Sequence, residues 1–155
     1  TTSIELKTSP FKRVQANLSH QNRKLSDGNR GRKTTAGAYY GVTPNIWVGV
    51  EGSQRGYDRQ DPSYWTPKKY RSYAATLDAS MPLSERSRLN ASLKAGRGKE
   101  QGVDGQSRTL YASLGADFDV GQNTTVSANV YHDESRRDGK KWHENGAMMN
   151  LTYRW

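Results

Sequence analysis

The chain has 155 residues, no cysteine, a hydrophobic fraction of 32% and a mean hydropathy of −1.01. No run of about 18 apolar residues exists, which excludes a transmembrane helix, and the length fits a single domain spanning residues 1–155. The net charge of +9 predicts a partner that carries negative charge, such as nucleic acid, anionic lipid headgroups or acidic polysaccharide.

Intrinsic disorder is the simplest interpretation of so polar a composition. Two features oppose it: aromatic residues make up 10% of the chain, and the apolar residues recur periodically. A transmembrane β-barrel explains the polar average, because only every second strand residue faces lipid while the lumen and the loops are polar. No signal peptide is present, so the chain is expected to be either a mature protein or an internal piece of a longer one.

Residues 1–10 contain a short alternation at Ile4 and Leu6, and Thr8-Ser9-Pro10 then predicts a turn. This segment is expected to be the end of a preceding strand. From Phe11 onward, apolar and polar residues alternate with period two, which is typical of strands with one apolar and one polar face. About eight strands of about 9–11 residues are expected, a length that crosses a bilayer when the strand is tilted. They begin near residues 11, 35, 46, 72, 88, 110, 126 and 145.

The final segment, residues 145–155, has the most telling pattern. Ala147, Met149, Leu151, Tyr153 and Trp155 fall on one face, and polar residues fall mainly on the other. A terminal strand that ends on an apolar-face aromatic residue resembles the C-terminal signature of bacterial outer-membrane β-barrels.

The connections between the expected strands are of two lengths. Short turns are predicted at TPN, PLSE and GQN, and long loops at residues 23–33, 53–69, 96–107 and 132–144. Short turns on one rim and long loops on the other are typical of outer-membrane barrels. A soluble β-sandwich is the main alternative, but it need not sort its turns by length. The sequence therefore predicts an all-β fold, an antiparallel transmembrane β-barrel, which is either closed or the C-terminal half of a larger barrel.

Several segments resemble a known family. They are QDPSYWTPKKY in a long loop, the Arg-bearing strand after PLSER, GRGKEQG, LGADFDV and MMNLTYRW. In order and spacing they are similar to the C-terminal barrel of exopolysaccharide-export outer-membrane proteins, which serve cellulose, poly-N-acetylglucosamine and Pel secretion. The resemblance covers residues 53–155. The family's barrel has about twice as many strands as this chain and follows periplasmic tetratricopeptide repeats, which are absent here. A phage-adsorption protein of the same layout is another relative by architecture.

The resemblance implies a bacterial outer-membrane location, a secreted polysaccharide as cargo and periplasmic export-complex proteins as partners. Membrane lipid and lipopolysaccharide are the further partners expected of such a barrel. The function implied is passive export of the polymer through a pore, without catalysis by this chain. The alternative is a non-conducting structural or receptor barrel that works through basic extracellular loops.

No catalytic residue, metal site or cofactor is predicted. His20, His132 and His143 are too scattered to share a metal, and cysteine is absent. The segment His132-Asp133-Glu134-Ser135 contains the letters of a triad, but adjacent strand residues point to opposite faces. GRGKEQG lacks the following GK[ST] of a phosphate-binding loop, so a flexible loop is expected there. An outer-membrane enzyme is the third alternative.

The polar strand faces are expected to line the lumen. Aromatic rings there could stack on pyranose sugars, and amides and charges could exchange hydrogen bonds with hydroxyl groups. In a narrow eight-stranded barrel, the same side chains would instead fill the lumen by pairing with each other. The predicted pore-lining residues are Arg13, Gln15, Asn17, Tyr39, Trp47, Glu51, Asp78, Arg88, Asn90, Lys94, Tyr111, Asp117, Asn129, Tyr131, Asn150 and Arg154, with Gln21 and Asp119 on the same faces.

The excess positive charge is predicted to lie in the loops, where it would meet lipopolysaccharide phosphates and play no part in transport selectivity. Nucleic-acid binding is not expected, because it would need basic residues on one continuous face with exposed aromatic rings. The basic residues assigned to loops are Arg23, Lys24, Arg30, Arg32, Lys33, Arg55, Arg59, Lys68, Lys69, Arg136, Arg137, Lys140 and Lys141.

Overall fold

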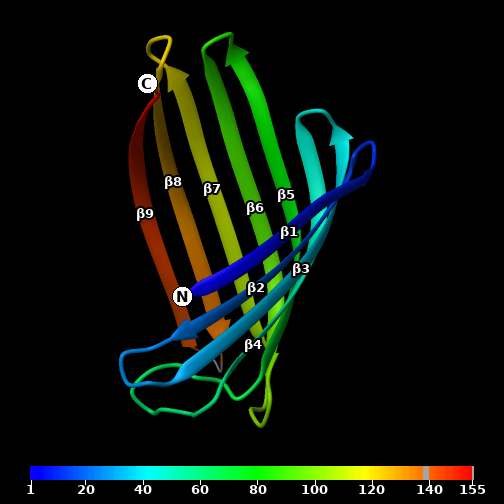
Figure 1. Ribbon diagram of the computed structural model, residues 1–155. Helices are drawn as coiled ribbons and strands as arrows, with labels where there is room; N and C mark the ends of the chain where they lie inside the picture. The colour runs from blue at the N-terminus through cyan, green and yellow to red at the C-terminus, as the bar shows by residue number, and fades with distance from the viewer. Residues whose placement is uncertain (138–139, 155) are drawn as a thin grey trace.

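The computed structural model describes residues 1–137 and 140–154. Within them, nine strands form one antiparallel sheet in which every strand pairs with its neighbours in the sequence (Figure 1). The strands are β1 Thr2–Phe11, β2 Val14–Lys24, β3 Arg30–Thr43, β4 Ile46–Tyr57, β5 Tyr70–Ser84, β6 Ser87–Glu100, β7 Ser107–Asp119, β8 Thr124–Arg137 and β9 Lys140–Tyr153. In these ranges there is no helix, and hence none that is long and apolar enough to span a membrane.

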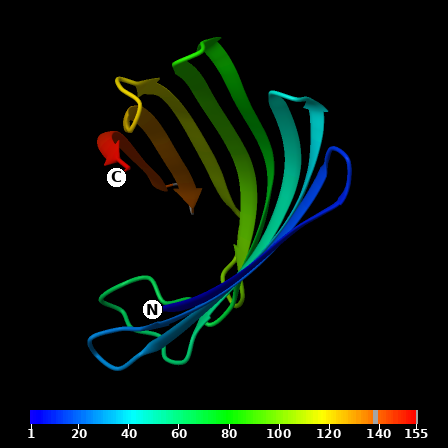
Figure 2. The same cartoon turned by 45° about the horizontal axis from the view of Figure 1, so that its top comes forward.

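The sheet is strongly curved and forms an open trough, with β1 and β9 at its two edges (Figure 2). The predicted all-β antiparallel fold is confirmed. The soluble sandwich is wrong, because all nine strands lie in one sheet and no second layer covers either face. A closed eight-stranded barrel is also not found within residues 1–137 and 140–154: there β1 pairs only with β2, and β9 only with β8.

The start of the chain differs from the prediction. Residues 2–11 form a full strand, and the expected turn at Thr8-Ser9-Pro10 is wrong. The chain reverses instead after Phe11, at Lys12 and Arg13, where Arg13 takes a φ of 74°. Pro10 fits within β1 because β1 is an edge strand whose register is irregular between Thr8 and Phe11.

The long-loop rim differs as well, because the strands continue into segments that were expected to be loops. Strand β6 runs through Glu100, so only residues 101–106 of the glycine-rich segment lie outside a strand. Most of the charged segment 132–144 belongs to β8 and β9, and the residues that join these strands, 138 and 139, lie outside the described residues. The sorting of connections is confirmed in part: short turns lie at one end of the trough, and the β2–β3, β4–β5 and β6–β7 loops lie at the other (Figure 1). The predicted long loop at residues 132–144 is wrong, because β8 and β9 take up nearly all of that segment.

The two faces of the sheet differ in chemistry. Glu51 of β4 and Lys94 of β6 reach each other across β5, which places their face on the concave side. Most apolar residues of each strand lie on the opposite, convex face, with Trp47 and Met148 among the exceptions, and large side chains such as Met149 (75% exposed) and Leu151 (71%) are exposed there. No hydrophobic residue in the described ranges is buried, so the sheet has no apolar core of its own.

The exposed aromatic side chains of Phe118 and Tyr153 stand on the convex face close to the short turns. Tyr40 lies at the same end and Tyr73 at the other, and both are exposed. Trp155, predicted to end the apolar face, lies outside the described residues.

Candidate functional site

The centre of the concave face carries a chain of hydrogen bonds and one ion pair that joins side chains of four strands, β2, β3, β4 and β6. Tyr39 on β3 donates its hydroxyl to Oε1 of Glu51 on β4 at 2.7 Å. Asn17 on β2 donates from Nδ2 to the Tyr39 hydroxyl at 3.2 Å. Glu51 also forms an ion pair with Lys94. The four side chains therefore fix one another, which leaves none of the Glu51 oxygens without a partner.

A second polar cluster joins β5, β6 and β7 nearer the short turns. Ser80 donates its hydroxyl to Oδ1 of Asn90 at 2.8 Å, and Asn90 donates from Nδ2 to Oδ2 of Asp117 at 2.7 Å. Ser92 donates its hydroxyl to Asp78. The carboxylates of this region thus accept hydrogen bonds from neutral groups, which holds them in place along the wall.

A third cluster lies on β7, β8 and β9. The rings of Tyr111 and Tyr131 are stacked, with centroids 6.3 Å apart and an interplanar angle of 24°. Tyr131 donates its hydroxyl to Oε1 of Glu144 at 2.7 Å. The stack gives the wall a broad aromatic surface.

Aromatic rings of the concave face lie against glycines of the neighbouring strand. Gly31 of β3 pairs with Tyr57 of β4, and a Cβ atom at Gly31 would lie 2.6 Å from Cε1 of that ring. The missing side chain lets the ring lie along the wall instead of standing up into the trough. The same relation holds for Tyr39 with Gly49, Trp47 with Gly41, Tyr70 with Gly98 and Tyr131 with Gly146.

The β4–β5 loop, residues 58–69, brings a further aromatic residue to the long-loop rim. Trp65, 44% exposed, donates from Nε1 to Oε2 of Glu100 at 3.0 Å. Its ring packs edge-on against Tyr70, with centroids 5.1 Å apart, and the Arg55 guanidinium lies 5.5 Å from the ring centroid. Glu100 is also paired with Arg137 at 2.7 Å. Thr66 and Pro67 of the same loop are buried.

The same loop is fastened to the β2–β3 loop by Asn29, which is 2% exposed. Asn29 Nδ2 donates to the Arg59 carbonyl at 2.9 Å, and Asn29 Oδ1 accepts from the Arg59 backbone N–H at 3.1 Å. Tyr64 donates its hydroxyl to Oδ2 of Asp27 at 2.5 Å. This hydrogen bond, joined by one from the Asn29 backbone N–H, lowers the pKa of Asp27, and it raises the pKa of Tyr64. We call Asp27, Asn29, Arg59 and Tyr64 the rim clasp.

Most residues predicted to line a pore lie on the concave face, and the structure joins several of them directly. The joined sets are Asn17, Tyr39, Glu51 and Lys94; Asn90 and Asp117; and Tyr111 and Tyr131. Gln15 lies directly opposite Tyr39 in the sheet, Trp47 opposite Asp78, and Arg88 opposite Asp117. Asn129 and Asn150 lie on the same polar side of the alternation.

Two of the predicted residues are not in strands. Arg13 is in the β1–β2 turn, so its placement on a strand wall is wrong, and Arg154 follows the end of β9. The prediction missed Tyr57, Tyr70 and Glu100, because their segments were assigned to loops. These three residues could have been found by continuing the period-two alternation of each strand through the charged segment at its end.

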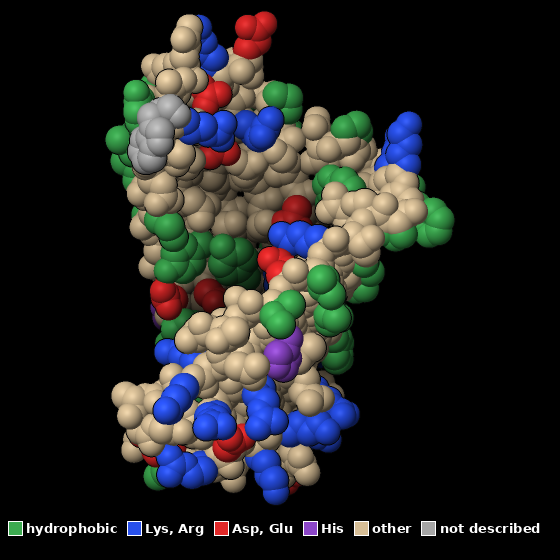
Figure 3. Space-filling view, viewed as in Figure 1, with side chains coloured by type: hydrophobic (Ala, Val, Ile, Leu, Met, Phe, Trp, Pro, Cys, Tyr) green, Lys and Arg blue, Asp and Glu red, His purple; other side chains and the backbone are tan. Residues whose placement is uncertain are grey.

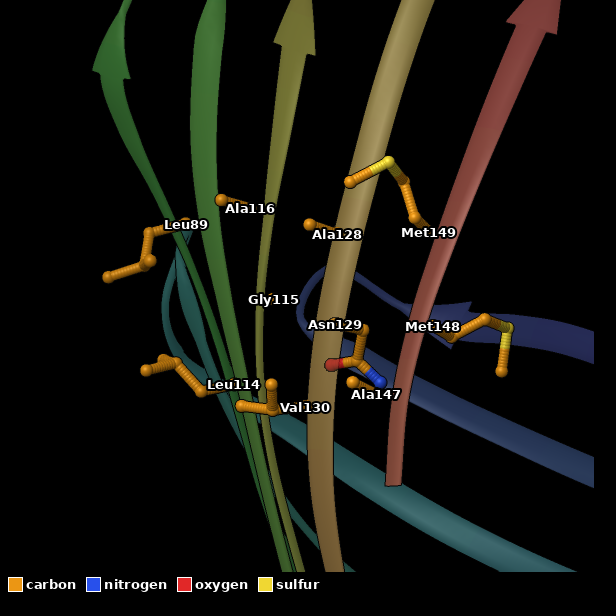
Figure 4. Close-up of a pocket in the computed structure, with 10 residues that line it drawn as sticks. All are labelled: Leu89, Leu114, Gly115, Ala116, Ala128, Asn129, Val130, Ala147, Met148 and Met149. Atoms are coloured by element: carbon orange, nitrogen blue, oxygen red, sulfur yellow. The ribbon is translucent and has the colours of Figure 1, made fainter. Parts of the chain in front are cut away.

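The convex face has a shallow apolar groove over β6 to β9, of about 420 Å³. Leu89, Leu114 and Met149 are among the residues that line it (Figure 4). Met148 and Met149 extend to opposite sides of β9, as alternation requires (Figure 4). The groove is lined almost wholly by aliphatic groups.

Two of the three histidines contact a polar side chain of the neighbouring strand. His132 Nδ1 lies 2.6 Å from Oδ1 of Asn145, and His20 Nδ1 lies 2.9 Å from the Thr34 hydroxyl. Glu134 accepts from Arg136 and pairs with Lys141, at 2.7 and 2.8 Å. Within residues 1–137 and 140–154, no group of three or more His, Asp and Glu side chains could hold a metal ion.

No protein-family model matches this sequence, and no curated protein is similar to it in sequence. A solved structure described as a bacterial polysaccharide outer membrane secretin has the same fold. The TM-score is 0.82 at 15% identity, over 99% of this chain and 55% of that chain. The chain therefore spans about half the length of this neighbour. The neighbour is an outer-membrane protein associated with polysaccharide, the class of protein that the sequence resemblance indicated, and the likeness in fold extends over the whole trough.

Proposed function

We propose that this chain forms part of the wall of an outer-membrane β-barrel through which a secreted polysaccharide passes. One observation supports this proposal most strongly: the single curved sheet has an exposed apolar convex face and a polar, aromatic concave face. No hydrophobic residue in the described ranges is buried. Lipid on the convex side would supply the apolar contacts that the sheet itself lacks.

The two open edges support a barrel completed by further strands. Unpaired backbone groups at an edge cost several kcal/mol each in hydrocarbon, so β1 and β9 need partners in a membrane. The structural neighbour is nearly twice as long as the matched region, which supports a larger barrel. Additional strands, from a longer chain or a second copy, would close the sheet.

Passive transport suits the concave face. Several of its polar groups, such as Glu51, Asn90 and Asp117, already have protein partners, and rings such as Tyr57 and Tyr131 lie along the wall. A polymer would meet many weak stacking and hydrogen-bonding contacts and no deep pocket, and this chain would perform no catalysis. Basic residues of the β4–β5 loop, Lys68 and Lys69, would face lipopolysaccharide if the long-loop rim is extracellular. Periplasmic export proteins would then act at the opposite rim.

Lipid exposure can be tested with single cysteines, because the chain has none of its own. Leu77 and Leu114 are on the convex face, and their sequence neighbours Asp78 and Ser113 are on the concave face. In the complete gene product inserted in liposomes, spin labels at Leu77→Cys and Leu114→Cys should collide with dissolved oxygen. Labels at Asp78→Cys and Ser113→Cys should collide with a water-soluble nickel complex instead. The same accessibility at both members of each pair contradicts a membrane-spanning sheet.

Transport is tested by conductance of the same complete product in planar bilayers. A steady conductance that neutral oligosaccharides block supports the pore. A correctly inserted but silent protein favours the alternative, a filled receptor barrel that works through its basic rim.

A further inference from the structure

Three cations that were predicted to lie in loops are on the concave wall. Arg23, Lys33 and Arg55 belong to β2, β3 and β4, because these strands run further than expected. Alternation puts them on the same face as Asn17, Tyr39 and Glu51 of those strands. The loop assignment of these three residues is therefore wrong, and their charge faces the trough. Figure 3 shows how densely Lys and Arg gather at this end of the molecule.

The strand register places two of these cations directly opposite each other. Lys33 and Arg55 are direct partners across the β3–β4 ladder. Like charges at directly opposite positions destabilise a sheet. None of the three cations forms an ion pair with a carboxylate of the described residues. Two acidic residues of this region already form ion pairs with other cations: Glu51 with Lys94, and Glu100 with Arg137.

These cations also line a hollow beside aromatic rings. Arg23, Lys33 and Arg55 surround a cavity of about 60 Å³ together with Gln21 and Tyr57. Tyr57 lies over Gly31, so its ring forms part of the floor. The Arg55 guanidinium also lies 5.5 Å from the centroid of the half-exposed Trp65 ring.

We propose that Arg23, Lys33 and Arg55, with the rings of Tyr57 and Trp65, form a subsite for the carboxylate groups of an acidic polysaccharide. The inference rests on the proposed export function and names the class of cargo. We call these five residues the cationic subsite.

The chemistry of the cationic subsite matches uronic acid units. Guanidinium groups bind carboxylates through paired, charge-assisted hydrogen bonds. The aromatic rings offer surface for the apolar faces of the sugar. A bound carboxylate would relieve the repulsion between Lys33 and Arg55. The wall of β8 and β9 is different: Asp133 and Glu144 are direct partners there. The positive charge that attracts the polymer's carboxylates is therefore confined to one side of the long-loop rim. The polymer can be bound there while the rest of the lumen is not uniformly positive.

The test measures binding and conductance separately on the complete gene product in detergent and in planar bilayers. The probes are tetragalacturonate, neutral cellotetraose and inorganic phosphate, and binding is read from the fluorescence change that follows burial of Trp65, with Trp65→Phe to assign the signal. Tetragalacturonate should bind at least about tenfold more tightly than cellotetraose, and its affinity should fall as salt rises. Phosphate should compete only weakly, because it lacks the sugar ring.

Each of Arg23→Gln, Lys33→Gln and Arg55→Gln should weaken tetragalacturonate binding by about tenfold, the effect of losing one charge-assisted contact, and leave cellotetraose binding nearly unchanged. Lys24→Gln is the matched control: it removes the same charge from the next residue of β2, on the opposite face. Lys33→Gln should fold, since its side chain has no hydrogen-bond partner in the described residues.

Equal affinity for the acidic and neutral tetrasaccharides, or equal effects of Lys33→Gln and Lys24→Gln, would overturn the cationic subsite even if the protein conducts. Phosphate that competes as strongly as tetragalacturonate would also overturn it, because the site would then bind any anion, including lipid phosphate. A silent channel that still binds tetragalacturonate in this pattern would refute the export function and leave the subsite standing.

Discussion

Tyr39 on β3 and Gly49 on β4 are direct cross-strand partners, and the tyrosine ring covers the glycine. A side chain at position 49 would collide with that ring, whose hydroxyl is hydrogen-bonded to Glu51. The absence of a side chain at Gly49 therefore decides how far the ring extends into the trough.

Gly49→Val should destabilise the protein by about 1–3 kcal/mol, as expected for overpacking, and it should lower the single-channel conductance by pushing the ring into the lumen. Urea unfolding in detergent and planar-bilayer recording measure the two effects. Gly52→Val is the control, since a Cβ at Gly52, on the convex face of the same strand, meets nothing within 4 Å. Similar losses in both variants would refute the role of the Tyr39–Gly49 pair.

The ion pair between Glu51 and Lys94 should contribute little net stability. The Lys94 side chain is 42% exposed and that of Glu51 is 19% exposed, so water screens the pair. A double-mutant cycle with Glu51→Gln and Lys94→Gln should give a coupling energy of about 1 kcal/mol or less. A coupling several times larger would mean that the trough excludes water at this level, which would argue for a filled lumen.

The rim clasp should depend on Asn29. Asn29→Ala removes acceptors from the backbone N–H groups of Arg30 and Arg59, and it should destabilise the β4–β5 loop by about 1–3 kcal/mol. Trypsin should then cleave after Arg59 faster than in the parent protein. Asn22→Ala, an exposed position of β2 without side-chain hydrogen bonds in the described residues, should leave the cleavage rate unchanged. Unchanged cleavage in Asn29→Ala would show that the loop is held by other contacts.

The rim clasp should also respond to pH at both extremes. The folded pKa of Asp27 is lowered, so its contribution is present above the unfolded value of about 3.9 and is lost as the pH falls through the folded value. The pKa of Tyr64 is raised, so its contribution is present below the unfolded value of about 10 and is lost as the pH rises through the folded one. The protection of the Asn29 backbone amide from hydrogen exchange, corrected for intrinsic exchange rates, should therefore be constant between about pH 5 and 9. In Tyr64→Phe the response to acid should shrink. A loop that opens near pH 7 would contradict this account.

Much of the sheet could be predicted from the sequence, because alternation with period two depends only on the direction of successive side chains. It placed Tyr39, Glu51 and Lys94 on one face and Leu77 and Leu114 on the other. It failed at the strand ends on the long-loop rim, where charged and glycine residues replace the apolar ones and the pattern disappears. Backbone pairing with the neighbouring strand continues there, since it requires no apolar side chain.

The sequence by itself determined the all-β class, the polar and apolar faces and the positions of the short turns at TPN, PLSE and GQN, because these follow from local alternation and turn residues. Only the tertiary structure decided which residues meet. It kept the sheet open at β1 and β9, fastened the two rim loops through Asn29, and placed Lys33 opposite Arg55. Those outcomes depend on strand register and sheet curvature, which arise from the pairing of segments far apart in the chain and are not encoded in any one of them.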